Sequence, residues 1–401
     1  MKNYSKITPE GTKDYLLSES RAIRFAEKKL SALFKSKGYQ KVMTPTIEFF
    51  DVFNRESSGY SPENLYSLTD SYGRLLVLRP DSTLPIARLA STRLQNATLP
   101  LRIYYNQNVF LRQKNLTGRS DEATQSGIEL MGVGGIRADL EVIATAVEAI
   151  ECCTSADFKL EIGHAGFFKD LCSNLGVDDE TISQIYDCVE SRNFVSLNKI
   201  LDNIGENAVT KCIRNLPRYF GGLDVIEKAK QIEIGDEGKK SLEYLKELYI
   251  QLEKMGLADK IIIDLSLVNR TNYYTGIIFK GYLQGSGVSV VSGGRYDLLG
   301  SEFGRDMQST GFGIETGDLA TVMLTRGEVE EEILPQIIVW GADEFITNAL
   351  EYSKSLRDSG VYCEISNFAT KEETLEYAKN KNFKTVCIID ENGTSEVQLW
   401  V

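Results

Sequence analysis

The chain has 401 residues with 45 Lys or Arg against 57 Asp or Glu, which gives a formal net charge of −12. A broad nucleic-acid surface needs clustered positive charge, so this balance argues against a tRNA or DNA partner. No apolar run is long enough to cross a bilayer, and the N-terminus lacks the apolar core of a signal peptide. We therefore expect a cytoplasmic protein with no membrane partner.

The cysteines and the single histidine give no sign of a metal site. Seven cysteines are present without a CxxC pair, and His164 is the only histidine. Cysteines in this pattern are typical of small buried apolar residues rather than of a disulfide framework. We find no GxGxxG phrase or P-loop in the C-terminal segment, so we expect no metal and no cofactor.

The first elements in chain order are a helix, a short strand and a strand that leads into a second helix. Ile23, Ala26 and Leu30 recur at helical spacing, with Ser18 or Ser20 as the expected N-cap. Residues 39–47 alternate like an edge or interface strand. Residues 75–83 read as a strand followed by a helix start.

At that helix start, Asp81 and Thr83 are placed either to cap the helix or to face a ligand. Both alternatives stay open from the sequence alone.

Residues 101–133 predict an antiparallel strand pair. Alternation with period two places Gln125, Gly127 and Glu129 on one face of the second strand. Gln125 provides an amide, Gly127 leaves space because it has no side chain, and Glu129 provides a carboxylate. Such a face could bind an amine or an imidazole N–H through charge-assisted hydrogen bonds. The alternative is an ordinary solvated face of a sheet.

The remainder predicts a helical excursion, a return to strands and a small α/β unit. Residues 167 to about 255 show helical spacing, and strands resume at Ile261. Short β-branched and aromatic runs between Asp264 and Leu319, bounded by glycine, predict consecutive strands. Their tyrosines and glycines suit either the floor of a ligand site or plain aromatic packing. After the acidic run 328–332, strands and helices alternate, so the whole is an α+β protein.

Six phrases, in matching order along the chain, resemble histidyl-tRNA synthetase. The resemblance implies an antiparallel class II synthetase sheet flanked by helices over residues 1–325, with a helical insertion at about 167–257. It also implies that residues 333–401 are similar to a shortened anticodon-binding domain. The matching phrases are Gly11 to Asp14, Thr44-Pro45, Leu78 to Thr83, Gln125 to Glu129, Tyr273 to Gly276 and Gly293 to Asp297.

The resemblance also implies a pocket that binds L-histidine. In that family, residues matching Asp81 and Gln125 lie near the α-amino group, and residues matching Glu129 and Tyr274 lie near the imidazole. The residues that the resemblance assigns to histidine binding are Asp81, Thr83, Gln125, Glu129, Tyr273, Tyr274 and Tyr296.

The positions that would hold ATP phosphates have changed. Where the family carries arginines, this sequence has Leu111, Asn269 and Asp318. A one-residue gap in the loop after Phe110 would instead place Arg112 at the first of them. Removing charge of this kind costs about two to three orders of magnitude in rate for each contact, so we expect no catalytic residue for adenylation.

A chain that keeps a histidine pocket but lacks an ATP site resembles the regulatory subunits of short-form ATP phosphoribosyltransferases. These enzymes act in the first step of histidine biosynthesis. The resemblance implies a hetero-oligomer with a short catalytic subunit, histidine feedback, and a homodimer to which the Thr44-Pro45 strand contributes. The alternatives are an active histidyl-tRNA synthetase with a divergent ATP site and a histidine sensor with another partner.

Overall fold

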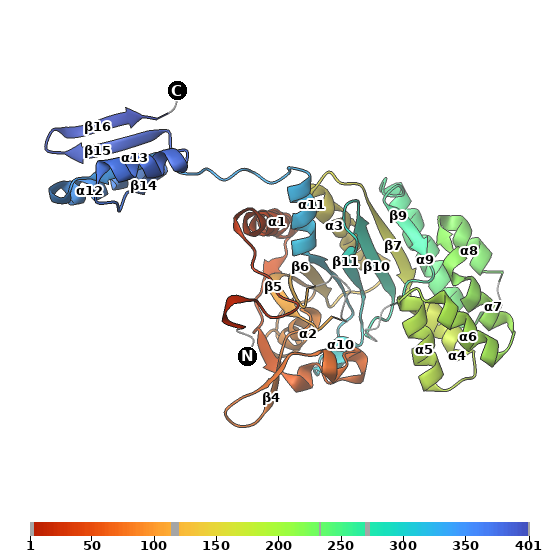
Figure 1. The fold of residues 1–401 in the computed structure, drawn as a ribbon. Coiled ribbons are helices and arrows are strands. Elements are labelled where there is room, and N and C mark those ends of the chain that lie inside the picture. The colour runs from red at the N-terminus through yellow and green to blue at the C-terminus, as the bar shows by residue number, and fades with distance from the viewer. Residues whose placement is uncertain (1–3, 114–119, 232–233, 269–272, 400–401) are drawn as a thin grey trace. The chain divides into compact units, whose positions relative to one another are not determined.

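The computed structural model describes residues 4–113, 120–231, 234–268 and 273–399. The chain divides into two compact units, Met1–Val329 and Glu330–Val401 (Figure 1). Within the described residues, no helix combines the length and the apolar character that a membrane crossing requires.

The first unit is organised around a nine-stranded sheet with the order β1-β5-β6-β12-β11-β10-β7-β9-β8. Its centre is antiparallel, whereas β1 pairs with β5 and β7 pairs with β9 in parallel. The strands are β1 (Gln40–Lys41), β5 (Leu101–Phe110), β6 (Glu122–Met131), β7 (Phe158–His164), β8 (Phe220–Gly221), β9 (Ile261–Asp264), β10 (Ile277–Leu283), β11 (Ser289–Arg295) and β12 (Ser309–Glu315).

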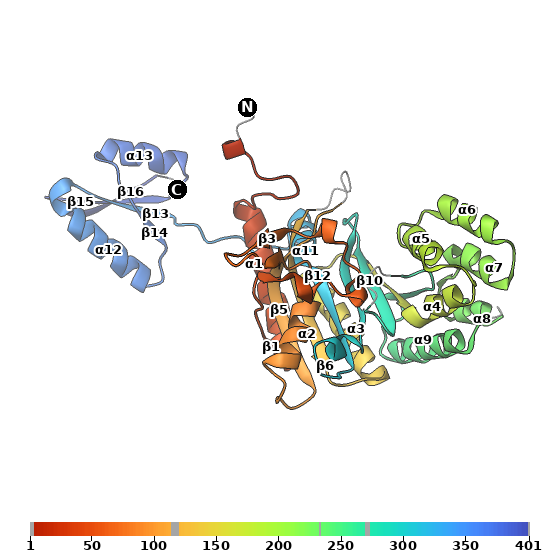
Figure 2. The same ribbon diagram turned by 90° about the horizontal axis from the view of Figure 1, so that it is seen from below.

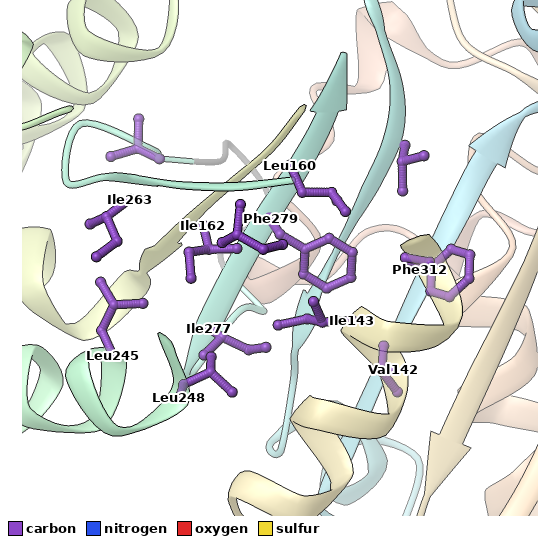
Figure 3. Close-up of a cluster of buried hydrophobic side chains, with 14 of the residues drawn as sticks. Val142, Ile143, Leu160, Ile162, Leu245, Leu248, Ile263, Ile277, Phe279 and Phe312 are labelled. Atoms are coloured by element: carbon purple, nitrogen blue, oxygen red, sulfur yellow. The ribbon is translucent and has the colours of Figure 1, made fainter. Parts of the chain in front are cut away.

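Three helices cover one face of this sheet: α1 (Leu17–Ser36), α3 (Ile136–Cys153) and α11 (Thr316–Thr325). Their apolar stripes pack on inward-facing side chains of the strands, because helical and strand periodicities each gather apolar residues on one side. Figure 3 shows part of this core, where Ile143 of α3 lies among Ile162, Phe279 and Phe312 of three strands.

Two expectations near the N-terminus are wrong. Helix α1 begins at Leu17, so Ser18 and Ser20 lie inside it, and Glu19 accepts a hydrogen bond from the backbone N–H of Leu16, 3.4 Å away. Residues 39–47 form only the two-residue strand β1 and the first residue of β2. Thr44 lies between them, and its carbonyl accepts a hydrogen bond from Arg79, 2.7 Å away.

The opposite face of the large sheet carries a second apolar core. A three-stranded sheet with the order β2-β4-β3 lies on this side of the molecule together with two helices. These elements are β2 (Ile47–Phe49), β3 (Ser67–Thr69), β4 (Leu75–Leu78), α2 (Thr83–Thr92) and α10 (Leu299–Glu302).

Between β7 and β9 the chain forms the helices that the sequence predicts. Figures 1 and 2 show them gathered at one end of the large sheet, beside β7 and β9. They are α4 (Ala165–Ser173), α5 (Asp179–Glu190), α6 (Phe194–Ile204), α7 (Ala208–Asn215), α8 (Leu223–Ala229) and α9 (Asp236–Lys254).

The second unit is a four-stranded sheet with the order β14-β13-β15-β16. Strand β13 pairs in parallel with both β14 and β15, and β16 is antiparallel. The second unit carries 14 acidic and 6 basic residues, so it accounts for −8 of the net charge of −12. Its elements are β13 (Ile337–Gly341), α12 (Ile346–Asp358), β14 (Cys363–Ile365), α13 (Lys371–Asn380), β15 (Thr385–Asp390) and β16 (Gly393–Gln398).

Candidate functional site

Three glycines on adjacent strands make space on the face of the sheet opposite α1 and α3. A Cβ added to Gly311 of β12 would lie 1.9 Å from a Glu129 carboxylate oxygen, and one added to Gly313 would lie 2.8 Å from Gln125. A Cβ on Gly294 of β11 would meet the Tyr274 ring at 2.7 Å. Polar side chains from β6 and from the loop before β10 therefore occupy the space above these glycines, which have no side chains of their own.

Glu129 is the most deeply buried acid of this cluster, with 1% of its surface exposed. The Thr83 hydroxyl donates to one carboxylate oxygen at 2.9 Å, and the Tyr296 hydroxyl donates to the other. Burial raises the pKa of Glu129 to about 8, although these two hydrogen bonds oppose the shift. Glu129 is thus a carboxyl group that a cationic or N–H donor ligand would stabilise in its charged form.

Asp81 is the second buried acid, at the start of α2. Its carboxylate accepts the backbone N–H of Leu84 at 3.0 Å and the Tyr60 hydroxyl at 2.6 Å. Burial raises its pKa to about 6, and its charge in turn raises the pKa of Glu129. The capping alternative for Asp81 is confirmed by its bond to Leu84, and its contact with Tyr60 leaves the ligand-facing alternative as a prediction.

The tyrosines and Gln125 complete the cluster. The rings of Tyr273 and Tyr274 lie 4.7 Å apart, and Tyr273 meets Tyr296 edge-on at 6.0 Å. Burial raises the pKa of Tyr274, and the charges of Glu129 and Asp81 raise it further, so its hydroxyl lies within electrostatic range of the two acids. Gln125 donates to Glu315 at 3.2 Å and accepts from Tyr105 at 3.3 Å. The structure therefore brings all seven predicted histidine-binding residues into one neighbourhood.

One detail of the prediction for this segment is wrong. Strand β10 begins at Ile277, so Tyr273 and Tyr274 belong to the loop that precedes it rather than to a strand. A loop sets the direction of each side chain individually, which lets two consecutive tyrosines lie near each other.

Tyr60, Tyr105 and Glu315 belong to the site although the sequence analysis did not select them. Tyr105 lies below Gly127, where an added Cβ would meet its hydroxyl at 2.5 Å, and Glu315 is paired with Gln125 in the β6–β12 register. Alternation along residues 101–110 was a signal for Tyr105. Tyr60 comes from a loop and carries no local signal.

Leu111 and Asp318, two of the positions where the resemblance predicts phosphate-binding arginines, carry no positive charge. Leu111 makes a bridge to Leu65, and Asp318 lies exposed in the first turn of α11. Asn269 and Arg270 lie outside the described residues. Arg112 lies over the Tyr66 ring, 4.9 Å from its centre.

Charges of both signs lie around Tyr15, close to the start of α11. Burial raises the pKa of the Tyr15 hydroxyl, Lys13 opposes the shift, and the carboxylates of Glu122 and Asp318 raise it further.

Directly behind Tyr296, Arg295 forms a buried ion pair. Its guanidinium contacts both oxygens of Asp139 on α3, at 2.7 and 3.1 Å, and it also binds Asp297 at 3.0 Å. Asp139 also accepts a hydrogen bond from Tyr244 of α9. The network fixes β11 to the helices behind it and so positions Tyr296 from the other side of the sheet.

A separate hollow of about 40 Å³ lies near β9 and β10, lined in part by Arg192, Asp264 and Lys280. Arg192 pairs with Asp264 and with Glu161, at 3.5 and 3.2 Å. These charges neutralise one another, so we assign this hollow no ligand. Among the described residues, no group of three or more His, Cys, Asp or Glu side chains is placed to hold a metal ion.

Comparison with known proteins defines the class of this fold and site. A family model described as histidyl-tRNA synthetase matches residues 11–319. A solved structure described as an ATP phosphoribosyltransferase regulatory subunit/histidyl-tRNA synthetase from Bacillus halodurans superimposes with a TM-score of 0.83 at 29% identity, over 97% of this chain and 98% of that chain. The fold is therefore that of a class II synthetase, as the motifs predict.

Curated relatives define the family within this class. The ATP phosphoribosyltransferase regulatory subunit of Clostridium kluyveri is 38% identical, over 96% of this chain and 99% of that protein. The protein of the same name from Clostridium acetobutylicum is 36% identical, over 98% of each chain. The chain belongs to the family of ATP phosphoribosyltransferase regulatory subunits. It is thus a non-catalytic subunit rather than an aminoacylating enzyme.

Proposed function

We propose that this chain binds L-histidine in the cluster around Glu129 and Asp81, and passes histidine feedback to a short-form ATP phosphoribosyltransferase catalytic subunit. The first step of histidine biosynthesis is the reaction that such a complex would control. The chain itself acts by binding, not by chemistry.

The observation that carries this proposal is the pair of buried carboxyl groups with raised pKa values, Glu129 and Asp81. Free histidine supplies a positive α-ammonium group and imidazole N–H donors, which such carboxylates bind through charge-assisted hydrogen bonds. Leu111 and Asp318 stand where the resemblance predicts phosphate-binding arginines, and neither carries positive charge, which supports a ligand without phosphates.

Feedback requires that histidine bind one state of the complex more tightly than another. A coupling of about 1–3 kcal/mol is usual for such regulation. Reconstitution tests the proposal: adding this chain should stimulate a purified short-form catalytic subunit, and histidine should then inhibit the mixture. Stimulation without inhibition would contradict the feedback role, and no stimulation would contradict the partner.

We further propose that the chain forms a homodimer through the outer face of the β2-β4-β3 sheet. Ile47, Phe49 and Leu68 are 46%, 44% and 37% exposed. The strand register aligns Phe49, Leu76 and Leu68 across this face, while Val77 on the other face is fully buried. An exposed apolar row of this kind is typical of an interface.

The double variant Phe49→Lys/Leu68→Lys should convert the dimer to a monomer, because two buried charges without partners disrupt an apolar interface. Sedimentation velocity measures the change. Ile346→Lys is a matched control, since Ile346 is 41% exposed but lies on α12 of the second unit. A dimer that persists in the double variant would place the interface elsewhere.

A further inference from the structure

Tyr60 places its hydroxyl inside the candidate histidine site although its ring is partly exposed. The hydroxyl donates to Asp81 at 2.6 Å. The hydroxyls of Tyr274 and Tyr105 both act on the pKa of Tyr60, which burial and Asp81 raise well above its ordinary value. The Tyr60 hydroxyl therefore lies within electrostatic range of two other tyrosines of the site, while Tyr60 as a whole is only half-buried.

Residues 53–61 form a short segment that directs Tyr60 inward. Phe53 is fully buried and meets the Tyr60 ring edge-on at 6.3 Å. The Ser58 hydroxyl donates to the carbonyls of Phe53 and Arg55, at 2.6 and 2.7 Å, and closes the loop on itself. Gly59 then adopts a left-handed backbone with φ of 69°, which turns the chain toward Asp81.

The segment contacts α10 through Arg55, and some polar atoms at this contact lack hydrogen-bond partners. Arg55 donates to the Glu302 carbonyl at 2.8 Å and lies over the Phe303 ring at 4.3 Å. Arg55 also forms an ion pair with Glu302 at 3.8 Å, but the Arg55 Nε and the Ser57 hydroxyl are buried without a hydrogen-bond partner. Buried polar atoms of this kind cost free energy, so water would compensate part of the loss if the segment moved away.

We propose that Tyr60 is a placeholder for the ammonium group of a bound amino acid, an inference that rests on the proposed histidine site. In this structure its hydroxyl satisfies the buried Asp81 carboxylate. Histidine brings an ammonium donor to the same carboxylate and displaces the Tyr60 hydroxyl. Residues 53–61 then leave their contact with Glu302, so occupancy of the pocket changes the surface of α10.

The opposite role for Tyr60 would be that of a fixed wall that holds Asp81 for the ligand. The two roles predict opposite signs for the removal of one oxygen atom. A wall residue that lost its hydroxyl would weaken histidine binding, whereas a placeholder that lost its hydroxyl would no longer compete.

The test is calorimetric titration of the full chain with histidine, before and after Tyr60→Phe. We expect histidine to bind the variant about 5-fold or more tightly, because no hydrogen bond to Asp81 has to break. Tyr377→Phe is the matched control: the Tyr377 hydroxyl donates to Glu364 at 2.9 Å in the second unit, and its loss should leave the affinity unchanged. Unchanged or weaker binding by Tyr60→Phe overturns the placeholder.

Hydrogen exchange on the wild-type chain gives a second readout. Histidine should accelerate exchange at the amides of Asn54 and Ser58, which donate to the carbonyl of Phe50, just before the segment, and to that of Arg55 within it. Slower or unchanged exchange there would overturn the displacement. A wild-type chain that binds no histidine overturns the proposed function as well, whereas binding with a failed Tyr60→Phe result overturns only this inference.

Discussion

Replacing Glu129 with Gln should weaken histidine binding by about 10- to 150-fold, equivalent to about 1.5–3 kcal/mol, as is usual when a charged hydrogen-bond partner is lost. The amide keeps the shape of the side chain and can still accept from Thr83 or Tyr296, so the fold should persist. Calorimetric titration measures the change. Glu364→Gln is the matched control, because Glu364 also accepts from a tyrosine but lies in the second unit.

The same variant should alter how stability depends on pH. The pKa of Glu129 is about 8 in the folded chain, against an ordinary value of 4.5. Between those values the unfolded chain has lost the proton while the folded chain keeps it, so this group lowers the free energy of unfolding as pH rises from about 4.5 through about 8. Glu129→Gln removes that contribution and should therefore be more stable than wild type at pH 8. Equal stability of the two chains at pH 8 would contradict the buried, raised-pKa carboxyl group.

Replacing Asp139 with Asn should destabilise the first unit by about 3–5 kcal/mol, because it leaves the buried Arg295 guanidinium without its main counter-charge. Asp139 is fully buried and contacts Arg295 through both oxygens. Asp297→Asn is a matched control on the same guanidinium. Its carboxylate is 24% exposed, so water replaces part of the lost contact and the destabilisation should be smaller.

Urea unfolding separates this effect from the second unit. Both tryptophans, Trp340 and Trp400, belong to residues 330–401. In Asp139→Asn, the transition followed by circular dichroism at far-ultraviolet wavelengths should therefore shift to lower urea, while the tryptophan fluorescence transition stays where it is. A loss of less than about 1 kcal/mol would mean that the pair contributes little, as exposed ion pairs do.

The face that binds the proposed ligand could be predicted because it depends on local alternation. Gln125, Gly127 and Glu129 follow one another at period two on one strand, and that spacing alone places them on one face. The resemblance to histidyl-tRNA synthetase then predicted that Asp81 and the tyrosines lie beside them. Strand β6 confirms the alternation, since Ser126 is fully buried on the opposite face and contacts α11 through Thr316, 2.9 Å away.

Other features depend on contacts that no local pattern encodes. The Asp139–Arg295 pair joins residues 156 positions apart. Tyr60 reaches Asp81 only because the chain between them forms the antiparallel pair β3 and β4 and returns. The N-terminus of α1 was misplaced because Ser18 and Ser20 are common capping residues, whereas Leu16 caps through its backbone and Glu19. Long-range pairing and backbone caps require the folded chain.

The most direct test of the whole account is calorimetric titration of the purified chain with histidine and, separately, with ATP. A site lined by the carboxylates of Glu129 and Asp81 should bind histidine with a single-site isotherm and show no heat from ATP. Binding of ATP, or an isotherm in which histidine gives no heat, would contradict the proposal that this family member keeps a site for the amino acid and has lost the site for the nucleotide.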